Sequence, residues 1–382
     1  MQRVRPQAKP LASLAWALLC ALAPALPVRA EAVPFDSGRW EIQARESRVV
    51  DHLGRSSLYL KGGVAAVKDS KFTNGVIEFD LALPRERGFM GAVWRMQDFE
   101  NYEEFYIRPH QSGNPDANQY TPIFNGVPAW QLYYGEGYGA PVGYDYGQWT
   151  HVKIVVNGGR AEVYVKDMET PALLVRELKR ETQEGRVGLS VGSFAPGHFS
   201  NFTFTALDNP PLKGNPPAAP ATPPGTVKSW MVSDAFDRKS LEGKYQLTPA
   251  DTEKLKWRTA GVEPNGTANL ARLQGVAEGR DTVFARLVIR SDREQVKKVR
   301  FGFSDEVKVY FNGRLLYGGS DIFQSRDYRF LGTIGLYDEL YLPLRRGENE
   351  LWLAVTENFG GWGVTARFEN LEGIRLADSG AR

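Results

Sequence analysis

The sequence has almost no cysteine, since Cys20 is the only one among its 382 residues. Cys20 lies in an apolar stretch near the N-terminus, so a chain that loses this stretch has no thiol. Such a chain forms no disulfide, no thiolate metal site and no cysteine nucleophile. An exported chain without disulfides depends on buried apolar surface, and this one is long enough for two cores of ordinary size.

The sequence also lacks an excess of charge of either sign. It has 47 Lys and Arg against 45 Asp and Glu, which leaves a net charge of +2. No bulk electrostatic attraction to nucleic acid or to an anionic membrane is therefore expected. A neutral partner fits this balance better.

Only one long apolar run is present, and its pattern is typical of a secretory signal peptide. Residues 1–30 combine an early basic segment, an apolar run over 11–26 and the small residues Val28 and Ala30 around Arg29, which predicts cleavage after Ala30. The run is shorter than the roughly 20 unbroken apolar residues of a membrane span. We therefore predict a periplasmic or secreted protein without an integral membrane segment in the mature chain.

Lipid anchoring through Cys20 is not expected. A lipoprotein signal needs a small residue directly before its cysteine, and Leu19 occupies that position.

Long helical patterns are scarce, and only short segments such as 177–183 have a helical pattern. Runs that alternate apolar and polar side chains, separated by Gly, Asn and Pro, are typical of strands. They lie at 76–83, 91–97, 102–108, 149–156, 160–165, 283–290, 298–303, 306–317, 340–344 and 349–355. These patterns predict an all-β protein of two antiparallel β-sandwich (jelly-roll) domains.

A proline-rich segment divides the strands into two groups. Residues 208–226 contain seven prolines and no alternating pattern, which is typical of an extended, semi-rigid linker. The predicted organisation is a signal peptide (1–30), a first sandwich (31–207), the linker (208–226), a second sandwich (227–376) and a tail (377–382).

One predicted strand of the first sandwich has an unusual polar face. Successive side chains of a strand point to opposite sides, so Phe105 and Ile107 are expected to face the core. The other side then has two tyrosines, two cationic or titratable side chains and a carboxylate: Tyr102, Glu104, Tyr106, Arg108 and His110. Rings offer flat surfaces for sugar faces and the polar groups bind hydroxyls, so this stripe predicts a ligand groove. A network of structural hydrogen bonds under the following loop is the alternative.

Neighbouring segments supply further candidate ligand-binding side chains. Other strands are expected to add Glu78, Asp80, Arg95 and Gln97. The segment from Arg108 to Pro141 is unusually long for a hairpin connection and rich in aromatic residues, which indicates an ordered lid or wall beside the stripe. Its candidate ligand-binding residues are Gln119, Tyr120, Trp130, Gln131 and Tyr133.

Residues 36–207 resemble the concanavalin A-like jelly roll of laminin G-type domains and of the 3-keto-disaccharide hydrolase family. The resemblance is carried by FTNGVIEFDLAL, GFMGAVWRMQDFENYEEFYIR, GQWTHVKIVVNGGRAEVYV, GRVGLSVG and FSNFTFTAL, in that order. It implies a sandwich fold and is compatible with either sugar binding or glycoside chemistry.

The catalytic motif of glucanases with this fold is incomplete. These retaining enzymes use E-x-D-x-x-E, whose glutamates act as nucleophile and acid/base. Here the segment begins at Glu78 and Asp80 but has Leu83 in place of the last glutamate. We therefore do not expect that double-displacement reaction.

No other catalytic motif is present, so the candidates for catalysis come from the stripe itself. His110 is the best general-base candidate, with Glu104 and Asp116 as further acid/base candidates, although a loop-anchoring hydrogen bond is the alternative role of His110. No cofactor is required and no metal ligand is assigned. Laminin G-type relatives often bind calcium, and Asp98 and Asp116 are the acids available for it.

Residues 227–376 resemble the galactose-binding-like β-sandwich that accompanies many carbohydrate-active proteins. The resemblance is carried by FARLVIRSDREQ, FGFSDEVKVYFNGRLLY and YLPLRRGENELWLAVTENFGGWG. Asn312-Gly313 predicts a hairpin turn. Trp362 either presents its indole to a sugar or is buried, and we favour burial. The second sandwich would also be able to dock on the first and complete its groove.

Three functions remain open. The first is an exported carbohydrate-binding protein that holds an oligo- or polysaccharide on the polar and aromatic face of the first sandwich. The second is a glycoside-active enzyme of the 3-keto-disaccharide hydrolase type. The third is a structural or adhesive protein without tight sugar binding.

Overall fold

The computed structural model describes residues 30–219 and 221–377. The predicted signal peptide up to residue 29, Cys20 within it, Pro220 and the tail residues 378–382 lie outside the described residues. The described chain is almost entirely β-structure, which confirms the predicted all-β sandwich class. Among these residues, no helix is both long and apolar enough to cross a bilayer.

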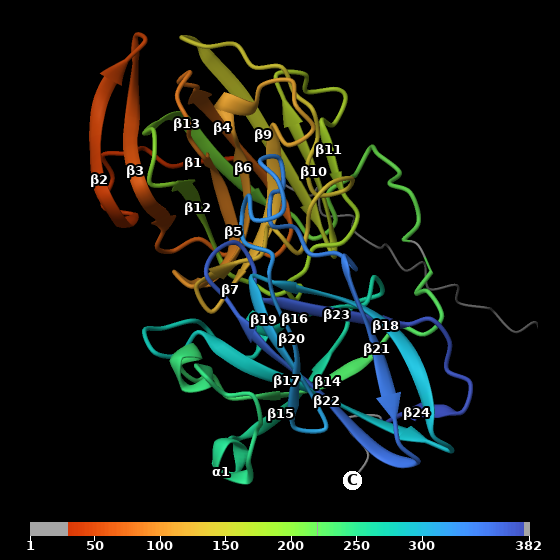
Figure 1. The fold of residues 1–382 in the computed structure, drawn as a ribbon. Coiled ribbons are helices and arrows are strands. Elements are labelled where there is room, and N and C mark those ends of the chain that lie inside the picture. The colour runs from red at the N-terminus through yellow and green to blue at the C-terminus, as the bar shows by residue number, and fades with distance from the viewer. Residues whose placement is uncertain (1–29, 220, 378–382) are drawn as a thin grey trace, which may run out of the picture.

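The first group of strands forms a single antiparallel sheet that curls around its own core (Figure 1). Its main path is β11-β10-β9-β4-β13-β3-β12-β5-β6-β7-β8, with β1 on β13 and β2 on β3. We call this unit the N-terminal sandwich. Its elements are β1 (Glu31–Ala32), β2 (Trp40–His52), β3 (Arg55–Val67), β4 (Gly75–Ala82), β5 (Met90–Asp98), β6 (Asn101–Ile107), η1 (Pro109–Gln111), β7 (Asn118–Phe124), β8 (Val127–Pro128), β9 (Trp149–Asn157), β10 (Arg160–Val165), β11 (Leu173–Val175), β12 (Arg186–Val191) and β13 (Gly197–Ala206).

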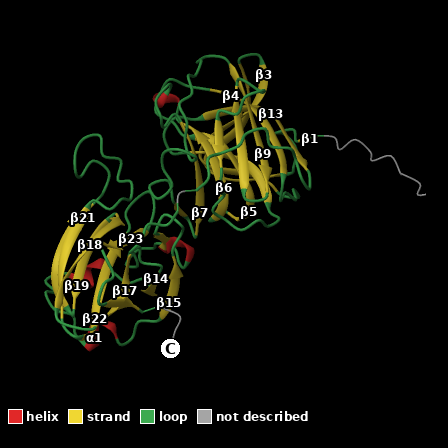
Figure 2. Cartoon of the chain, turned by 90° about the vertical axis from the view of Figure 1, so that its right-hand side faces the viewer, coloured by secondary structure: helices red, strands yellow, loops and turns green. Residues whose placement is uncertain are grey.

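The second group forms two facing sheets, which we call the C-terminal sandwich (Figure 2). One sheet follows β15-β14-β17-β22-β19-β20 with β24 on β17, and the other follows β16-β23-β18-β21. The elements are β14 (Ser229–Ser233), η2 (Arg238–Leu241), α1 (Pro249–Thr252), β15 (Trp257–Gly261), β16 (Thr267–Asn269), η3 (Leu270–Arg272), β17 (Thr282–Ser291), β18 (Gln295–Ser304), β19 (Glu306–Phe311), β20 (Arg314–Ser320), β21 (Asp338–Leu344), β22 (Gly347–Thr356), β23 (Gly363–Phe368) and β24 (Ile374–Leu376).

Local predictions in the C-terminal sandwich are confirmed. Asn312 and Gly313 connect β19 to β20 with positive φ angles of 47° and 80°, the conformation that favours Asn-Gly in a two-residue hairpin. Trp362 is completely buried, and its indole N–H donates to the carbonyl of Val355 at 3.1 Å. The segment 177–183, by contrast, is not helical.

The connection between the sandwiches lies partly against the first of them. The backbone amides of Lys213 and Gly214 donate to the buried carboxylate of Glu162 at 2.9 and 2.6 Å. Asn157 donates to the carbonyl of Pro210 at 2.9 Å. This half of the proline-rich segment is therefore held in place by hydrogen bonds to β9 and β10.

The two sandwiches contact each other directly. Phe124 and Val127 of the N-terminal sandwich belong to the hydrophobic core of the C-terminal one. Buried Lys179 forms an ion pair with Glu263 at 2.6 Å, and Asn125 donates to the carbonyl of Ala271 at 2.8 Å. An apolar contact combined with polar bonds fixes one relative placement of the two units.

Candidate functional site

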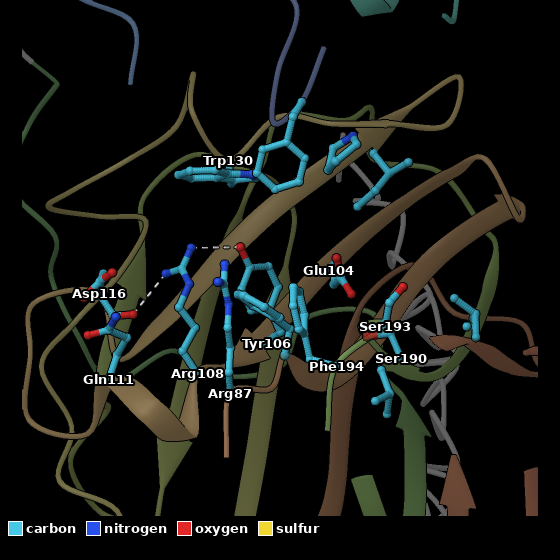
Figure 3. A pocket seen from close by; sticks show the side chains of 18 of the residues that line it. Arg87, Glu104, Tyr106, Arg108, Gln111, Asp116, Trp130, Ser190, Ser193 and Phe194 are labelled. Carbon is cyan, nitrogen blue, oxygen red and sulfur yellow. Dashed lines mark hydrogen bonds between the residues drawn. The ribbon is translucent and has the colours of Figure 1, made fainter. Parts of the chain in front are cut away.

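A large cavity lies where the outer face of the N-terminal sandwich meets loops of the C-terminal sandwich. Its volume is about 680 Å³, within the range of roughly 300–1,000 Å³ of small-molecule sites. Most of the lining comes from β3, β6, β7, β12 and nearby loops, and Phe323, Leu331 and Phe359 come from the C-terminal sandwich. Figure 3 shows the side chains around it.

The floor of the cavity is the polar face of β6. Phe105 and Ile107 are completely buried in the core, as the alternation predicts. The intervening side chains Tyr102, Glu104 and Tyr106 line the cavity. The strand ends at Ile107, so Arg108 and His110 reach the same cavity from the turn that follows, and His110 lies in η1 rather than in the strand.

Arg108 is fixed by three hydrogen bonds. Its guanidinium donates to the Tyr106 hydroxyl and to the carbonyl of Asp116, each at 3.0 Å (Figure 3), and to Gln119 Oε1 at 2.7 Å. Gln119 is itself held because its amide donates to the carbonyls of Trp130 and Tyr133. Arg108 is only 5% exposed, so its position on the cavity wall is well defined.

Aromatic side chains surround this guanidinium. Its central carbon lies 5.0 Å from the ring centroid of Tyr106, 5.8 Å from that of Trp130 and 5.9 Å from that of Phe89. Trp130 in turn packs against Phe359 of the C-terminal sandwich at 5.8 Å between centroids. The cavity therefore presents flat apolar surfaces next to fixed hydrogen-bond donors, an arrangement suited to sugar rings.

Glu104 is the carboxyl group at the other end of the stripe. Burial raises the pKa of Glu104 to about 7, and the neighbouring Ser190 hydroxyl only partly opposes this shift. Burial also raises the pKa of Tyr106 to about 12. Glu104 is therefore protonated in a large fraction of molecules near neutral pH and can donate a proton or a hydrogen bond.

The three predicted acid/base candidates line one cavity but do not form a triad. Glu104 and Arg108 are four residues apart in extended chain, which separates them by about 13 Å, and Asp116 is bonded at the Arg108 end. Burial and then the charges of Arg87 and Arg108 lower the pKa of His110. Its Nδ1 accepts from the amide of Gly88 at 3.4 Å, which is the loop-anchoring alternative.

Three of the predicted ligand-binding residues do not line the cavity and are buried elsewhere in the protein: Tyr120, Gln131 and Tyr133. The Tyr120 hydroxyl donates to Glu103 at 2.5 Å inside the core, and the Tyr133 hydroxyl donates to Glu263 across the interface between the sandwiches. Gln131 is also buried at this interface. Of the predicted loop residues, Trp130 lines the cavity and Gln119 supports Arg108 from behind.

Arg95 and Gln97 are also directed away from the stripe. Arg95 has a positive φ of 47°, which interrupts the alternation of β5, and its buried guanidinium donates to the carbonyls of Thr73 and Gly158. Gln97 donates to the carbonyls of Arg95 and Glu184. Both side chains are used to hold backbone.

Glu78 and Asp80 belong to a separate network on β4 and β9. Asp80 accepts hydrogen bonds from His151 at 2.7 Å, and from Arg55 and Asn201 at 2.6 Å each. Hydrogen bonds to Asp80 and then Glu78 raise the pKa of His151 to about 9. Burial alone would raise the pKa of Asp80, but these partners outweigh burial and lower it. Both carboxylates therefore belong to the network around His151, and neither lines the cavity.

Asp98 and Asp116, the acids named for calcium, lie in different surroundings. Asp98 accepts from the amide of Glu100 at 2.8 Å and from the Asn101 side chain at 3.0 Å, whereas Asp116 lines the cavity. Within residues 30–219 and 221–377, no group of three or more His, Cys, Asp and Glu side chains is arranged to hold a metal ion. Calcium binding stays a prediction.

Several cavity residues were not identified from the sequence. Arg87 and Phe89 follow β4 in a loop, Ser190 to Phe194 lie at the end of β12, and Phe359 follows β22. The glycines of GRVGLSVGSF, which indicate close strand packing, gave the only signal for the second group. Phe359 comes from a distant part of the chain, and no local pattern links it to β6.

Comparison with known proteins finds structural similarity only. No protein-family model matches the chain, and no curated protein matches it. The carbohydrate binding module CBM66 from Bacillus subtilis aligns at 16% identity over 44% of this chain and 96% of its own, with a TM-score of 0.34. The β-glucanase of Bacillus licheniformis aligns at 11% identity over 47% of this chain and 98% of its own, with a TM-score of 0.35.

A Bacillus subtilis protein of unknown function with a galectin-like fold aligns at 9% identity over 44% of this chain and 88% of its own, with a TM-score of 0.30. At these identities and scores, the matches assign neither a family nor a function. The laminin G-type and galactose-binding-like resemblances therefore stay predictions within a confirmed β-sandwich architecture.

Proposed function

We propose that this chain is an exported carbohydrate-binding protein that holds a saccharide in the cavity between its two sandwiches. The observation that carries the proposal is the wall formed by Tyr106, Arg108 and Trp130. Two aromatic rings flank a guanidinium whose position is fixed by hydrogen bonds to its neighbours. Rings of this kind pack on the apolar faces of sugars while fixed donors bind the hydroxyl oxygens.

Three further features support this proposal. The cavity of about 680 Å³ is large enough for a short saccharide. The side chains on its floor come from a strand, so they are held more precisely than loop residues would be. Finally, Phe359 and Phe323 remain 57% and 40% exposed, which leaves apolar surface for a ligand to cover.

A glycan array followed by calorimetry tests this proposal. We expect the wild-type chain to bind at least one glycan, and Trp130→Ala to weaken that binding at least tenfold because a stacking surface is lost. Tyr245→Ala is the matched control, since Tyr245 is 76% exposed and lies outside the cavity. Absence of binding to every glycan, or equal affinity of the Trp130→Ala variant, would show the proposal to be wrong.

A glycoside-cleaving enzyme is the second candidate, and the environment of Glu104 favours it. A carboxyl group with a pKa of about 7 is suited to protonate a leaving oxygen near neutral pH. We then expect release of product from glycosides, including 3-keto glycosides, that Glu104→Gln abolishes while saccharide affinity is retained. His110→Ala tests the alternative base in the same assay, and a wild-type chain that is inert on all substrates excludes this candidate.

A further inference from the structure

Two guanidinium groups lie at one end of the cavity without a carboxylate partner. In the described part of the chain, neither Arg87 nor Arg108 has a carboxylate oxygen at ion-pair distance. The acceptors of Arg108 are a phenol, an amide and a backbone carbonyl, all of them uncharged. Other arginines of the N-terminal sandwich differ in this respect, since Arg55 and Arg186 both form ion pairs.

The burial of Arg108 makes this arrangement informative. Its side chain is among the buried charged groups, at 5% exposure, and buried charges in proteins are normally paired. Its three hydrogen bonds use three of the five N–H donors of a guanidinium. Two donors remain for a ligand in the cavity, and among the described residues no carboxylate oxygen lies at ion-pair distance from this guanidinium.

Arg87 adds a second positive charge at the same end. Its guanidinium lies 4.5 Å from the Phe194 centroid and 5.8 Å from the Phe89 centroid, and Phe89 is also the neighbour of Arg108. The charges of both arginines act on His110, and in the view of Figure 3 Arg87 and Arg108 lie on one side of Tyr106 and Glu104 lies on the other. Arg87 is exposed, so its side chain is free to close on a bound group.

The acids of the cavity do not cancel this charge. Asp116 is near this end and offsets one of the two arginines at most, while its carbonyl, not its carboxylate, accepts from Arg108. Glu104 lies at the opposite end, where burial raises its pKa to about 7 and reduces its negative charge. The arginine end therefore retains a net positive charge around neutral pH.

We propose that the saccharide held in this cavity is acidic, and that a carboxylate on its ring binds between Arg87 and Arg108. This inference rests on the proposed carbohydrate-binding function and narrows it to uronic acids. A planar carboxylate matches the two-pronged donor geometry of a guanidinium, which gives both strength and orientation. The sugar ring then lies against Trp130 and Tyr106.

Calorimetry with matched pairs of oligosaccharides tests the inference. The probes are oligogalacturonate, oligomannuronate and glucuronoxylan oligosaccharides, each with its methyl ester, and a sulfated oligosaccharide set. We expect at least one acid to bind ten times more tightly than its ester, with the difference shrinking in 0.5 M salt as charges are screened. Arg87→Gln should weaken binding of the acid about fivefold and leave binding of the ester unchanged.

Arg85→Gln is the matched control. Arg85 is an exposed arginine two residues earlier in the same loop, it lies 4.6 Å from the Tyr146 centroid, and it does not line the cavity. Its loss removes the same charge from the protein and should not change affinity for either probe. Equal effects of both substitutions would indicate a general charge effect and contradict the assignment to the cavity.

The remaining outcomes separate the two proposals. If neutral glycans or esters bind as tightly as the acids and Arg87→Gln has no effect, the acidic ligand is wrong and carbohydrate binding stands. If only sulfated probes bind, the carboxylate is wrong and the anionic group is a sulfate ester. If no saccharide of any class binds, the proposed function is wrong and this inference is wrong with it.

Discussion

Trp130 and Phe359 pack edge to face at 5.8 Å between ring centroids, with an interplanar angle of 64°. They are 229 positions apart in the sequence and belong to different sandwiches, yet both line the same cavity. The C-terminal sandwich therefore contributes to the lining of the proposed binding site. If a saccharide binds there, this relationship predicts a direct role of the second sandwich in its affinity.

Replacing Phe359 tests this role. Phe359 is 57% exposed, so Phe359→Ala should change the melting temperature little, while the lost apolar surface should weaken saccharide binding about fivefold. Calorimetry together with a thermal melt measures both quantities. Tyr341→Ala, at an equally exposed position of β21 outside the cavity, is the control. Unchanged affinity in the Phe359 variant would mean that the ligand does not contact Phe359.

Glu104 should make stability depend on pH. Its pKa is raised from 4.5 to about 7 in the fold, so the folded state binds a proton that the unfolded chain releases. Stability from this group is present below pH 4.5 and is lost as the pH rises through 7. Glu104→Gln should therefore have the same free energy of unfolding as the wild type near pH 4.5. At pH 8 the variant should be more stable by about 1 kcal/mol, after allowance for solvent screening, and should melt at a higher temperature.

Melting curves recorded between pH 4.5 and 8.5 check this expectation. Glu86→Gln, an exposed acid in the loop before β5, is the matched control and should follow the wild type at every pH. Parallel curves for the wild type and Glu104→Gln would contradict the raised pKa.

The floor of the site could be predicted because strand alternation is a local property. Phe105 and Ile107 face the core and Tyr102, Glu104 and Tyr106 face the cavity, as period-two alternation requires. The alternation does not reveal which strands are neighbours. β13, β3 and β12 separate β4 from β5, so Glu78 and Asp80 are far from the stripe although their pattern resembles it.

Other differences between the expected and the observed placement of side chains have different physical causes. Arg95 has a positive φ, which turns its side chain away from the face that its position in the alternation indicates. Tyr120 and Tyr133 have apolar rings and polar tips, so their composition is the same whether they bind a sugar or a buried carboxylate. Phe359 reaches the cavity only through docking of the sandwiches, which no local sequence pattern encodes.

A buried acid pair in the C-terminal sandwich should limit stability at high pH. Burial raises the pKa of Asp305 to about 6, and burial together with repulsion from Asp305 raises that of Glu357 well above its ordinary value. One oxygen of Glu357 accepts from the amide of Gly361 at 3.0 Å, and the other has no partner among the described residues. Raised pKa values in acids mean that stability falls as the pH rises above 4.

Glu357→Gln keeps the oxygen that binds Gly361 and removes the charge next to Asp305. We expect the variant to be more stable than the wild type by about 1 kcal/mol at pH 8 and equal to it near pH 4, as measured by denaturant unfolding. Glu348→Gln, on the exposed start of β22, is the control. A less stable variant at pH 8 would contradict this account and indicate a counter-ion between the two acids.

Gln131 connects the two sandwiches and should couple stability to binding. Its amide donates to the carbonyl of Leu331 at 3.0 Å, and its Oε1 accepts from the Ser304 hydroxyl at 3.2 Å. Its backbone also bonds to Gly360 and Ile334 at 2.9 and 3.0 Å. These bonds hold the loops that bring Leu331 and Phe359 to the cavity.

Gln131→Ala removes only the side-chain bonds, so we expect a loss of stability of about 1–2 kcal/mol from the unpaired buried groups. Saccharide affinity should fall as well, and amide hydrogen exchange should rise in residues 321–337 because their anchor is lost. Gln97→Ala is the control, since the Gln97 side chain also makes two hydrogen bonds, both of them to backbone carbonyls, but lies within the N-terminal sandwich and outside the cavity. It should lower stability without changing affinity. Equal affinities for the Gln131 variant and the wild type would show that the C-terminal loops keep their place without this anchor.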